Sequence, residues 1–448
     1  MFLLAFMCCL LCTNTACNDD DPDQDGILGV LDLEPNTPLE FKSIVDAHGK
    51  AIIKNVFFLM DNTSSMDGFK VKDSEFKKFT YALAVELADK NLVGKIKYQT
   101  DSSRMTINSL KEFEAILQSK SKKDSDIGIH FKDFCNNVND TTLSIYVTDA
   151  QIDISTKDKS ISNNADAAVK ISVGITSALT PIFNDPKSKS AIIIKMSSKF
   201  DGNYDKSSGA TNNQSRSIKI NGIRPYYIFV VGPTTLINFF INNSLQVVYN
   251  KEEYKKYIQD VSVIHYDLDS PLAASVTNED NFIDKEKTKP TSAWAFADNN
   301  LTYFDDDLPI QVNIGLDLSV LMRLQPSKVF MASDFSIDGV TVLECKTKQV
   351  FLNKYPNISE PNKYDNSTVV LKVQIDNPQK LKNINIYYTR NYWDKNTYSI
   401  DEDFDITNVA NQGNTYKMNQ IIDGFFTADK TNKDHQKLKI SSFSITKF

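Results

Sequence analysis

The chain has little glycine and proline, few histidines and no cluster of basic residues. Its 448 residues include only 15 glycines and 14 prolines, which excludes a collagen-like or low-complexity protein. The formal net charge is -7 and no run is rich in lysine or arginine, so nucleic acid is not an expected partner. The 4 histidines are scattered, and no glycine-rich loop that could cradle a phosphate is present. These absences favour a binding protein, and we predict that the chain is not an enzyme.

The N-terminus is almost wholly apolar and predicts an export signal. Residues 1–12 are too few to span a bilayer as a helix, and they fit the apolar region of a signal peptide. Ala16 then precedes Cys17, which resembles the lipobox of bacterial lipoproteins. The resemblance implies a signal peptide at 1–16, Sec export and a membrane anchor on lipidated Cys17. No basic residue precedes the apolar run, and an ordinary secretory peptide or an uncleaved anchor is the alternative.

An acidic stretch follows the expected lipidation site, at residues 17–40. It resembles the surface-export signal of lipoproteins of the Bacteroidetes group, which implies a place on the outer membrane at the cell surface. Within it, acidic residues and a glycine match the calcium-loop pattern D-x-D-x-D-G-x5-[DE]. These acidic residues are Asp21, Asp23, Asp25 and Asp32. Alternate aspartates can wrap one Ca2+, so we predict a calcium loop here, with a solvated acidic tether as the alternative.

Apolar runs alternate with amphipathic segments between about residues 50 and 250. The runs at 51–60, 143–148, 191–196 and 226–232 predict buried strands, and those at 74–90 and 165–183 predict helices. This alternation predicts an α/β domain at 41–270 with a doubly wound, Rossmann-like, mostly parallel sheet. Residues 197–222 are rich in Ser, Asn, Gly and Lys, and we interpret them as an insertion before the last strand. Ligands of such sheets bind at the carboxyl ends of the strands.

Hydroxyl and carboxylate residues follow two of these strands. The first strand runs into Asp61, Thr63 and Ser65, and a later one runs into Asp149, with Ser125 opening a helix between them. In this order the residues resemble the metal-ion-dependent adhesion site (MIDAS) of the von Willebrand factor A (vWA) family, D-x-S-x-S followed by Thr and Asp. Thr63 and Ser125 depart from the pattern, but each keeps a hydroxyl. The usual TDG after the last strand is TDA here.

The same residues suit a hard divalent cation without the family resemblance. Mg2+, or Mn2+ in its place, prefers oxygen ligands and keeps some waters. Two carboxylates and three hydroxyls would leave the metal a residual positive charge and an open position. The resemblance implies that a carboxylate of a protein partner completes the shell, in adhesion or in assembly of an envelope complex.

Two other interpretations stay open. One is a metal-independent vWA scaffold that binds its partner without an ion. The other is a hydrolase, because the sequence around Asp61 also resembles haloacid dehalogenase-type phosphatases, whose first strand ends in D-x-D-x-T. Thr63 stands where that family has its second, proton-donating carboxylate.

The C-terminal third has a different pattern. We expect a polar linker at 271–304, followed by short segments rich in Val, Ile, Thr and Tyr that are separated by Asn, Asp, Lys and Pro. This pattern predicts an all-β domain at 305–448, an antiparallel sandwich of the immunoglobulin-like kind.

Overall fold

The computed structural model describes about three fifths of the chain. The described residues are 55–89, 96–100, 105–107, 109–121, 127–152, 164–184, 189–205, 217–245, 248, 258–265, 273–276, 295–297, 300–303, 310–324, 328–356, 364–377, 381–389, 398–400, 406–429 and 437–447. The predicted signal peptide, Cys17, the aspartates of the predicted calcium loop and Ser125 lie outside them. No helix among the described residues is long and apolar enough to cross a membrane.

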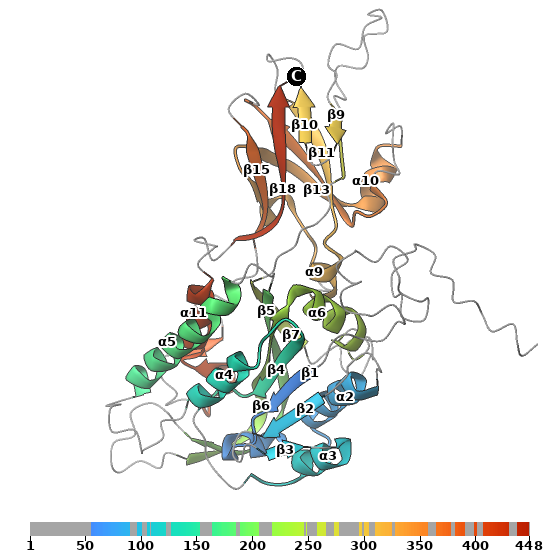
Figure 1. The fold of residues 1–448 in the computed structure, drawn as a ribbon. Coiled ribbons are helices and arrows are strands. Elements are labelled where there is room, and N and C mark those ends of the chain that lie inside the picture. Colours follow the sequence, from blue (N-terminus) through green and yellow to red (C-terminus); the bar gives the residue numbers. More distant parts are fainter. Residues whose placement is uncertain are drawn as a thin grey trace, which may run out of the picture.

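A seven-stranded sheet forms the centre of the N-terminal part (Figure 1). Its strand order is β3-β2-β1-β4-β6-β5-β7. The strands are β1 (Asn55–Met60), β2 (Ile96–Thr100), β3 (Met105–Ile107), β4 (Thr142–Thr148), β5 (Lys189–Asp205), β6 (Ser217–Pro233) and β7 (Ile258–His265). Every residue of the central strand β4 is buried. A sheet whose strands are buried on both faces must have other elements packed against each face.

Helices provide this cover (Figure 1). One face carries α2 (Glu75–Asp89), α3 (Leu110–Gln118) and α6 (Thr234–Phe239), and the other carries α4 (Ile127–Asn136) and α5 (Asn164–Phe183). Successive side chains of a strand point to opposite faces, so Phe58 joins the first core while Phe57 and Leu59 join the second. The prediction of an α/β unit is confirmed.

The sheet is mixed, so the prediction of a mostly parallel sheet is wrong. Only β1–β2 and β1–β4 pair in parallel, whereas β2–β3, β4–β6, β5–β6 and β5–β7 are antiparallel. β5 and β6 follow each other as a hairpin, and antiparallel strands need no crossover helix between them. The interpretation of residues 197–222 as an insertion is also wrong for much of this segment, because β5 extends to Asp205 and β6 begins at Ser217. The polar composition of the segment gives no sign of these strand extensions.

The hairpin extends beyond the rest of the sheet as a two-stranded ribbon. Its pairing continues from Ser197↔Pro225 to Asp205↔Ser217, past the last β4 partner. Phe200 of the ribbon packs edge-to-face on Phe69, with the ring centroids 4.9 Å apart. Phe69 ends η2 (Ser64–Phe69), the short 3-10 helix that follows β1. The ribbon therefore supports the loop at the carboxyl end of β1.

A close approach of two glycines joins the ribbon to η2. A Cβ atom added at Gly202 would lie 2.5 Å from the Cα of Gly68, a backbone atom that cannot rotate away. We therefore expect Gly202→Ala to lower the free energy of unfolding by about 1–3 kcal/mol through overpacking. Gly174 on α5 is the control, because a Cβ there meets nothing within 4 Å. Gly174→Ala should stabilise the helix by about 0.5–1 kcal/mol, and urea unfolding of both variants measures the contrast.

The C-terminal part contains two further sheets, with orders β12-β15-β18-β10-β9 and β13-β14-β11-β8. Their pairs are antiparallel except β10–β18. The strands are β8 (Ala273–Val276), β9 (Ala295–Ala297), β10 (Asn300–Tyr303), β11 (Ile310–Leu316), β12 (Phe335–Ile337), β13 (Thr341–Thr347), β14 (Val369–Ile375), β15 (Asn383–Thr389) and β18 (Lys437–Lys447). Three of these strands come from residues 271–304, where we expected a linker.

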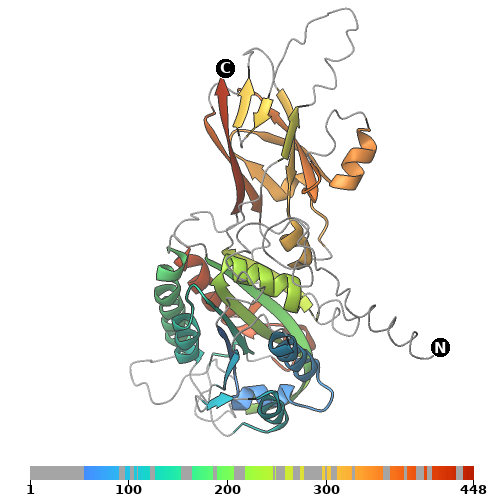
Figure 2. The ribbon, with the colours of Figure 1, turned by 45° about the vertical axis from the view of Figure 1, so that its right-hand side comes forward.

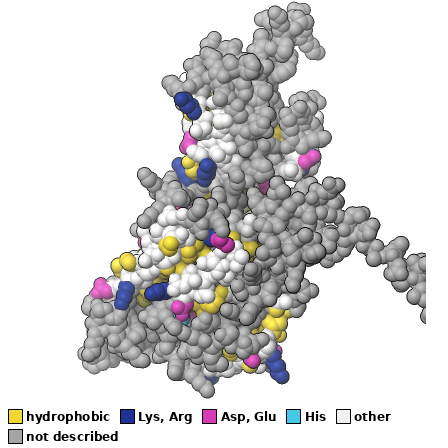
Figure 3. Space-filling view, viewed as in Figure 1, with side chains coloured by type: hydrophobic (Ala, Val, Ile, Leu, Met, Phe, Trp, Pro, Cys, Tyr) yellow, Lys and Arg dark blue, Asp and Glu magenta, His cyan; other side chains and the backbone are white. Residues whose placement is uncertain are grey.

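This part is not wholly β, unlike the prediction. It contains α9 (Ser319–Leu324), α10 (Lys348–Lys354) and α11 (Met418–Ala428), with a small parallel pair, β16 (Ser399–Ile400) and β17 (Thr415–Tyr416). α11 packs against α5 of the α/β unit, where Thr176 donates a hydrogen bond to the carbonyl of Gly424 (3.1 Å). The outer face of α5 exposes Val169 and Val173, and Figure 3 shows apolar side chains over this region.

The two sheet-bearing parts lie one above the other (Figures 1 and 2). In both views η2 lies at the end of the α/β unit away from the C-terminal sheets. The carboxyl end of β1 therefore faces away from the C-terminal β sheets.

Candidate functional site

Two aspartates meet at the carboxyl ends of neighbouring strands. Asp61 follows β1 and Asp149 follows β4, and these strands pair in parallel up to Met60↔Val147. The backbone N–H of Asp61 donates to the carbonyl of Val147 at 2.8 Å, which ties the two strand ends together. The two aspartates are only 4% and 7% exposed, respectively. The two aspartates are far apart in the sequence, and the parallel pairing of β1 with β4 brings them together.

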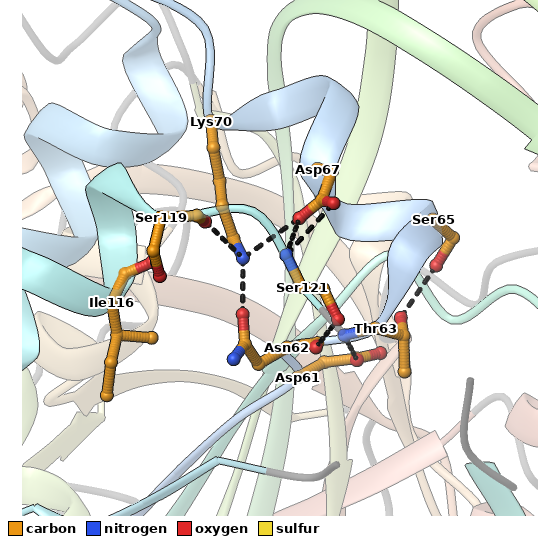
Figure 4. Close-up of polar contacts among 9 residues, drawn as sticks. All are labelled: Asp61, Asn62, Thr63, Ser65, Asp67, Lys70, Ile116, Ser119 and Ser121. Carbon is orange, nitrogen blue, oxygen red and sulfur yellow. Dashed lines mark hydrogen bonds and ion pairs between the residues drawn. The ribbon is translucent and has the colours of Figure 1, made fainter. Parts of the chain in front are cut away.

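Hydrogen bonds join the predicted ligand residues into one chain. The Thr63 N–H donates to Asp61 Oδ1 at 3.0 Å, and the hydroxyls of Thr63 and Ser65 lie 2.8 Å apart (Figure 4). Ser65 in turn hydrogen-bonds Asp149. The Thr148 hydroxyl donates to Asp61 Oδ2 at 2.8 Å. Four of the predicted ligands are thus in one place, and the fifth, Ser125, lies outside the described residues.

A tight turn directs Asp149 into this cluster. Ala150 has a left-handed backbone, with φ 55°, which is uncommon for a residue with a Cβ. Its N–H donates to the Thr148 hydroxyl at 3.0 Å, and the Gln151 N–H donates to Asp149 Oδ1 at 3.0 Å. The turn ends β4 and points the carboxylate back over the strand ends.

Asp149 is a buried carboxyl group close to a second carboxyl group, that of Asp61. Burial, followed by the negative charge of Asp61, raises the pKa of Asp149 to about 6. Hydrogen bonds from Gln151 and Ser65 and the positive charge of Arg224 oppose this rise only in part. A buried pair of carboxylates disfavours its own ionised state, and a bound cation would remove that penalty.

A buried lysine, Lys70, hydrogen-bonds the loop that follows Asp61 (Figure 4). The Lys70 ammonium group donates to Asp67 Oδ1 at 3.1 Å, to the carbonyl of Ser119 at 3.1 Å and to the side-chain oxygen of Asn62. Burial lowers its pKa, while Asp67 and Asp61 oppose this effect. The lysine is thus fully occupied by acceptors and serves to shape the loop.

The same network binds the loop after α3. The Ser121 N–H donates to both carboxylate oxygens of Asp67, at 2.7 and 3.0 Å, and the Ser121 hydroxyl donates to the carbonyl of Asn62. Asp67 and Asn62 therefore connect η2 with the residue that precedes the segment carrying Ser125. This role of Lys70 and Asp67 was not predicted from the sequence, although their opposite charges stand three positions apart, a spacing at which side chains interact.

A second buried cation, Arg224, lies close enough to Asp149 for its charge to lower the pKa of that carboxyl. Its guanidinium donates to the carbonyls of Gln412 (3.0 Å) and Asn414 (3.2 Å) in the C-terminal segment. The neighbouring Tyr227 hydroxyl lies 3.0 Å from that of Thr415. The C-terminal segment thus contacts two residues of β6 whose neighbour is Asp149. No local sequence signal predicts a contact between residues 188 and 190 positions apart.

The donor set fits a hard divalent cation. Two carboxylates and two hydroxyls converge, and oxygen ligands of this kind suit Mg2+ or Mn2+. Among the described residues, no group of three or more His, Cys, Asp or Glu side chains could hold a metal. A cation here would therefore depend on hydroxyls, waters and a ligand from outside for the rest of its shell.

Comparisons with known proteins add no relative. No family model, no curated protein and no solved structure matches the chain. The chemistry of the site therefore rests on the residues themselves.

Proposed function

We propose that the chain binds a protein partner through a divalent cation held by Asp61, Thr63, Ser65 and Asp149, with Ser125 as a further ligand. The observation that carries this proposal is the hydrogen-bonded chain from Asp61 to Asp149, which ends in two buried carboxylates side by side. Mg2+ or Mn2+ is the proposed ion. The order of these ligands supports a MIDAS-like site in a vWA-like unit whose sheet carries an added antiparallel ribbon.

The charges around the site favour an acidic partner. A divalent cation would neutralise Asp61 and Asp149, and Asp67 offsets Lys70. Arg224 would then contribute a remaining positive charge, since its hydrogen bonds go to neutral carbonyls. A carboxylate of the partner would neutralise that charge and fill an open position on the metal.

The location of the protein is part of the proposal. Lipidation of Cys17 would anchor the chain to the outer membrane, and the acidic tether at 17–40 would hold the binding unit at the cell surface. Asp21, Asp23, Asp25 and Asp32 would bind Ca2+ in that tether. The β-rich C-terminal unit is proposed as an immunoglobulin-like module. Adhesion and assembly of an envelope complex are the two roles that suit this arrangement.

Thermal unfolding titrated with Mg2+ or Mn2+ tests the proposal. A ligand that binds only the folded state stabilises it, by roughly 2.7 kcal/mol at a hundredfold excess over its Kd. We expect such a rise for the wild type and for Asp166→Asn, an exposed acidic residue of α5. We expect no rise for Asp149→Ala. A rise that is equal in all three proteins would place the metal elsewhere, and a partner that binds despite a chelator would favour a metal-independent scaffold.

A further inference from the structure

One edge of the β5–β6 ribbon has no neighbouring strand among the described residues. β6 pairs with β4 only from Tyr227 to Val231, while its pairing with β5 continues to Ser217. Beyond Tyr227, no described strand lies on the β4 side of β6. Within the described part of the chain, no strand therefore continues the β4 row beyond the point at which Asp149 leaves it, and the side chain of Gln412 lies beside Gly222 on this part of β6.

The direction of one hydrogen bond shows which backbone groups face the continuation of the β4 row. The Lys199 N–H donates to Glu75 at 2.8 Å, away from β6, so Lys199 and its partner Ile223 form a pair that does not exchange ladder bonds. Such pairs alternate along an antiparallel ladder. The N–H and C=O groups of Ile223, Asn221 and Lys219 consequently point to that row.

These outward groups are free within the described part of the chain. No hydrogen bond to the outward backbone groups of Lys219, Asn221 or Ile223 is found there. The side chains of all three are exposed, with Ile223 at 51%. A row of unpaired backbone donors and acceptors is a template for an added strand.

The free edge begins at the candidate metal site. Thr148, the residue before Asp149, faces Tyr227 across the last β4–β6 pair. An extended chain that continued the β4 row would therefore start beside Asp149, pass Pro225, which has no N–H to donate, and pair with Ile223, Asn221 and Lys219. Its first side chain would lie within reach of a cation held by Asp61 and Asp149.

We propose that the partner presents an extended acidic segment, which adds a strand to this edge of β6 and places a carboxylate on the metal. The inference rests on the proposed function and specifies its ligand. Antiparallel pairing is the more stable arrangement, and it puts the acidic residue at the N-terminal end of the segment. Backbone bonds to β6 supply affinity, and the metal selects the carboxylate.

The charges near the edge favour an acidic segment over a second copy of the chain. Arg224 lies at the start of the edge and carries the positive charge there, while the exposed Lys219 farther along is paired with Asp201, with its Nζ 2.7 Å from Asp201 Oδ1. In a symmetric antiparallel pairing of two copies, each copy would bring its own Lys219 and Arg224 to the same interface. A lysine on an edge strand discourages such self-pairing.

Two proline variants give a matched test. Asn221→Pro removes an N–H that faces the free edge and leaves the β5–β6 ladder intact. Asn203→Pro is the control, because Asn203 is also exposed and its N–H points to the opposite edge of the ribbon. Both full-length proteins are first checked by thermal unfolding with and without Mg2+, which reports the metal site separately.

The probe is a phage-displayed library of random peptides, bound to the wild type in Mg2+ and released with EDTA. We expect selected peptides to carry Asp or Glu before an alternating β-branched stretch. Their Kd should rise about tenfold or more for Asn221→Pro and change less than about twofold for Asn203→Pro. In a paired strand, every second N–H of the peptide faces β6 and the others face away. N-methylation of the amides that face β6 should weaken binding, and N-methylation of the others should not. This comparison tests strand pairing without altering the protein.

Each other outcome overturns the inference in a recognisable way. If Mg2+ stabilises the protein but selected peptides bind Asn221→Pro as tightly as the wild type, the edge is not used and the metal-site proposal stands. The edge is also unused if Mg2+ stabilises the protein and no peptide is selected. If Mg2+ does not stabilise the wild type, both proposals fail. A concentration-dependent dimer lost in Asn221→Pro would assign the edge to a second copy.

Discussion

Asp149→Asn should make the metal-free protein more stable at neutral pH and remove its stabilisation by Mg2+. The amide is nearly the same size, and its oxygen can still accept the hydrogen bond from the Gln151 N–H. It carries no charge, so the repulsion with Asp61 and the cost of burying a second carboxylate disappear. The same change removes a charged metal ligand. A residue that lowers the stability of the metal-free protein and is needed to bind the metal is typical of a binding site.

The pH dependence gives the size and sign of this effect. The pKa of Asp149 in the folded protein is about 6, raised from an ordinary value of 3.8. Its protonated form is therefore favoured by folding, and stability falls as the pH rises through that interval. The full loss, roughly 3 kcal/mol, is reached above pH 6. We expect Asp149→Asn to abolish this fall, measured by urea unfolding in EDTA between pH 4 and about pH 8.

Asp166→Asn is the matched control, since Asp166 is exposed on α5. Asp166→Asn removes a negative charge from the first turn of α5, which should lower stability by about 0.3–1 kcal/mol. It should still show the wild-type fall in stability as the pH rises, and it should keep the response to Mg2+. If Asp149→Asn were instead less stable than the wild type throughout this range, Asp149 would be a structural acceptor rather than one of two opposed carboxylates.

Lys70→Met should be among the most destabilising single substitutions in the α/β unit. The Lys70 side chain is 4% exposed, and its ammonium group donates hydrogen bonds to Asn62, Asp67 and Ser119. Methionine can preserve the packing of the stem, but it leaves the Asp67 carboxylate without its cation. Removing one partner of a buried pair costs about 3–5 kcal/mol, and we expect about 2–4 kcal/mol here because Asp67 is partly exposed.

The control for Lys70 is another lysine close by in the sequence. Lys78 lies 4.0 Å from Asp73, and both side chains are about half exposed or more, at 49% and 64%. Lys78→Met should change the free energy of unfolding by less than about 0.5 kcal/mol. Lys70→Met should also weaken Mg2+ binding, because Asn62 adjoins Asp61. Equal effects of the two substitutions would show that the network of Figure 4 does not hold the loop.

Local sequence signals predicted the centre of the site. An apolar strand followed by Asp61, Thr63 and Ser65, and another followed by Asp149, are patterns within a few residues, and the structure brings these four together. The strand periodicity was enough to place them at one edge of the sheet.

The parts that could not be predicted depend on distant contacts. Nothing in the apolar run at 191–196 says whether its neighbours are parallel or antiparallel, since both kinds of buried strand have the same composition. Arg224 resembles any surface arginine until the carbonyls of Gln412 and Asn414 meet it. The amphipathic stripe of α11 was detectable, but its packing on α5 depends on the course of the whole C-terminal half.

The number of Mn2+ ions bound tests the central claim most directly. Electron paramagnetic resonance counts free Mn2+ in the presence of the full chain, with Asp21, Asp23 and Asp25 replaced by asparagine so that the tether does not contribute. We predict that this protein binds Mn2+ in an equimolar ratio, that Mg2+ displaces it, and that Asp61→Asn abolishes binding. Equal Mn2+ binding with and without Asp61→Asn would contradict the account.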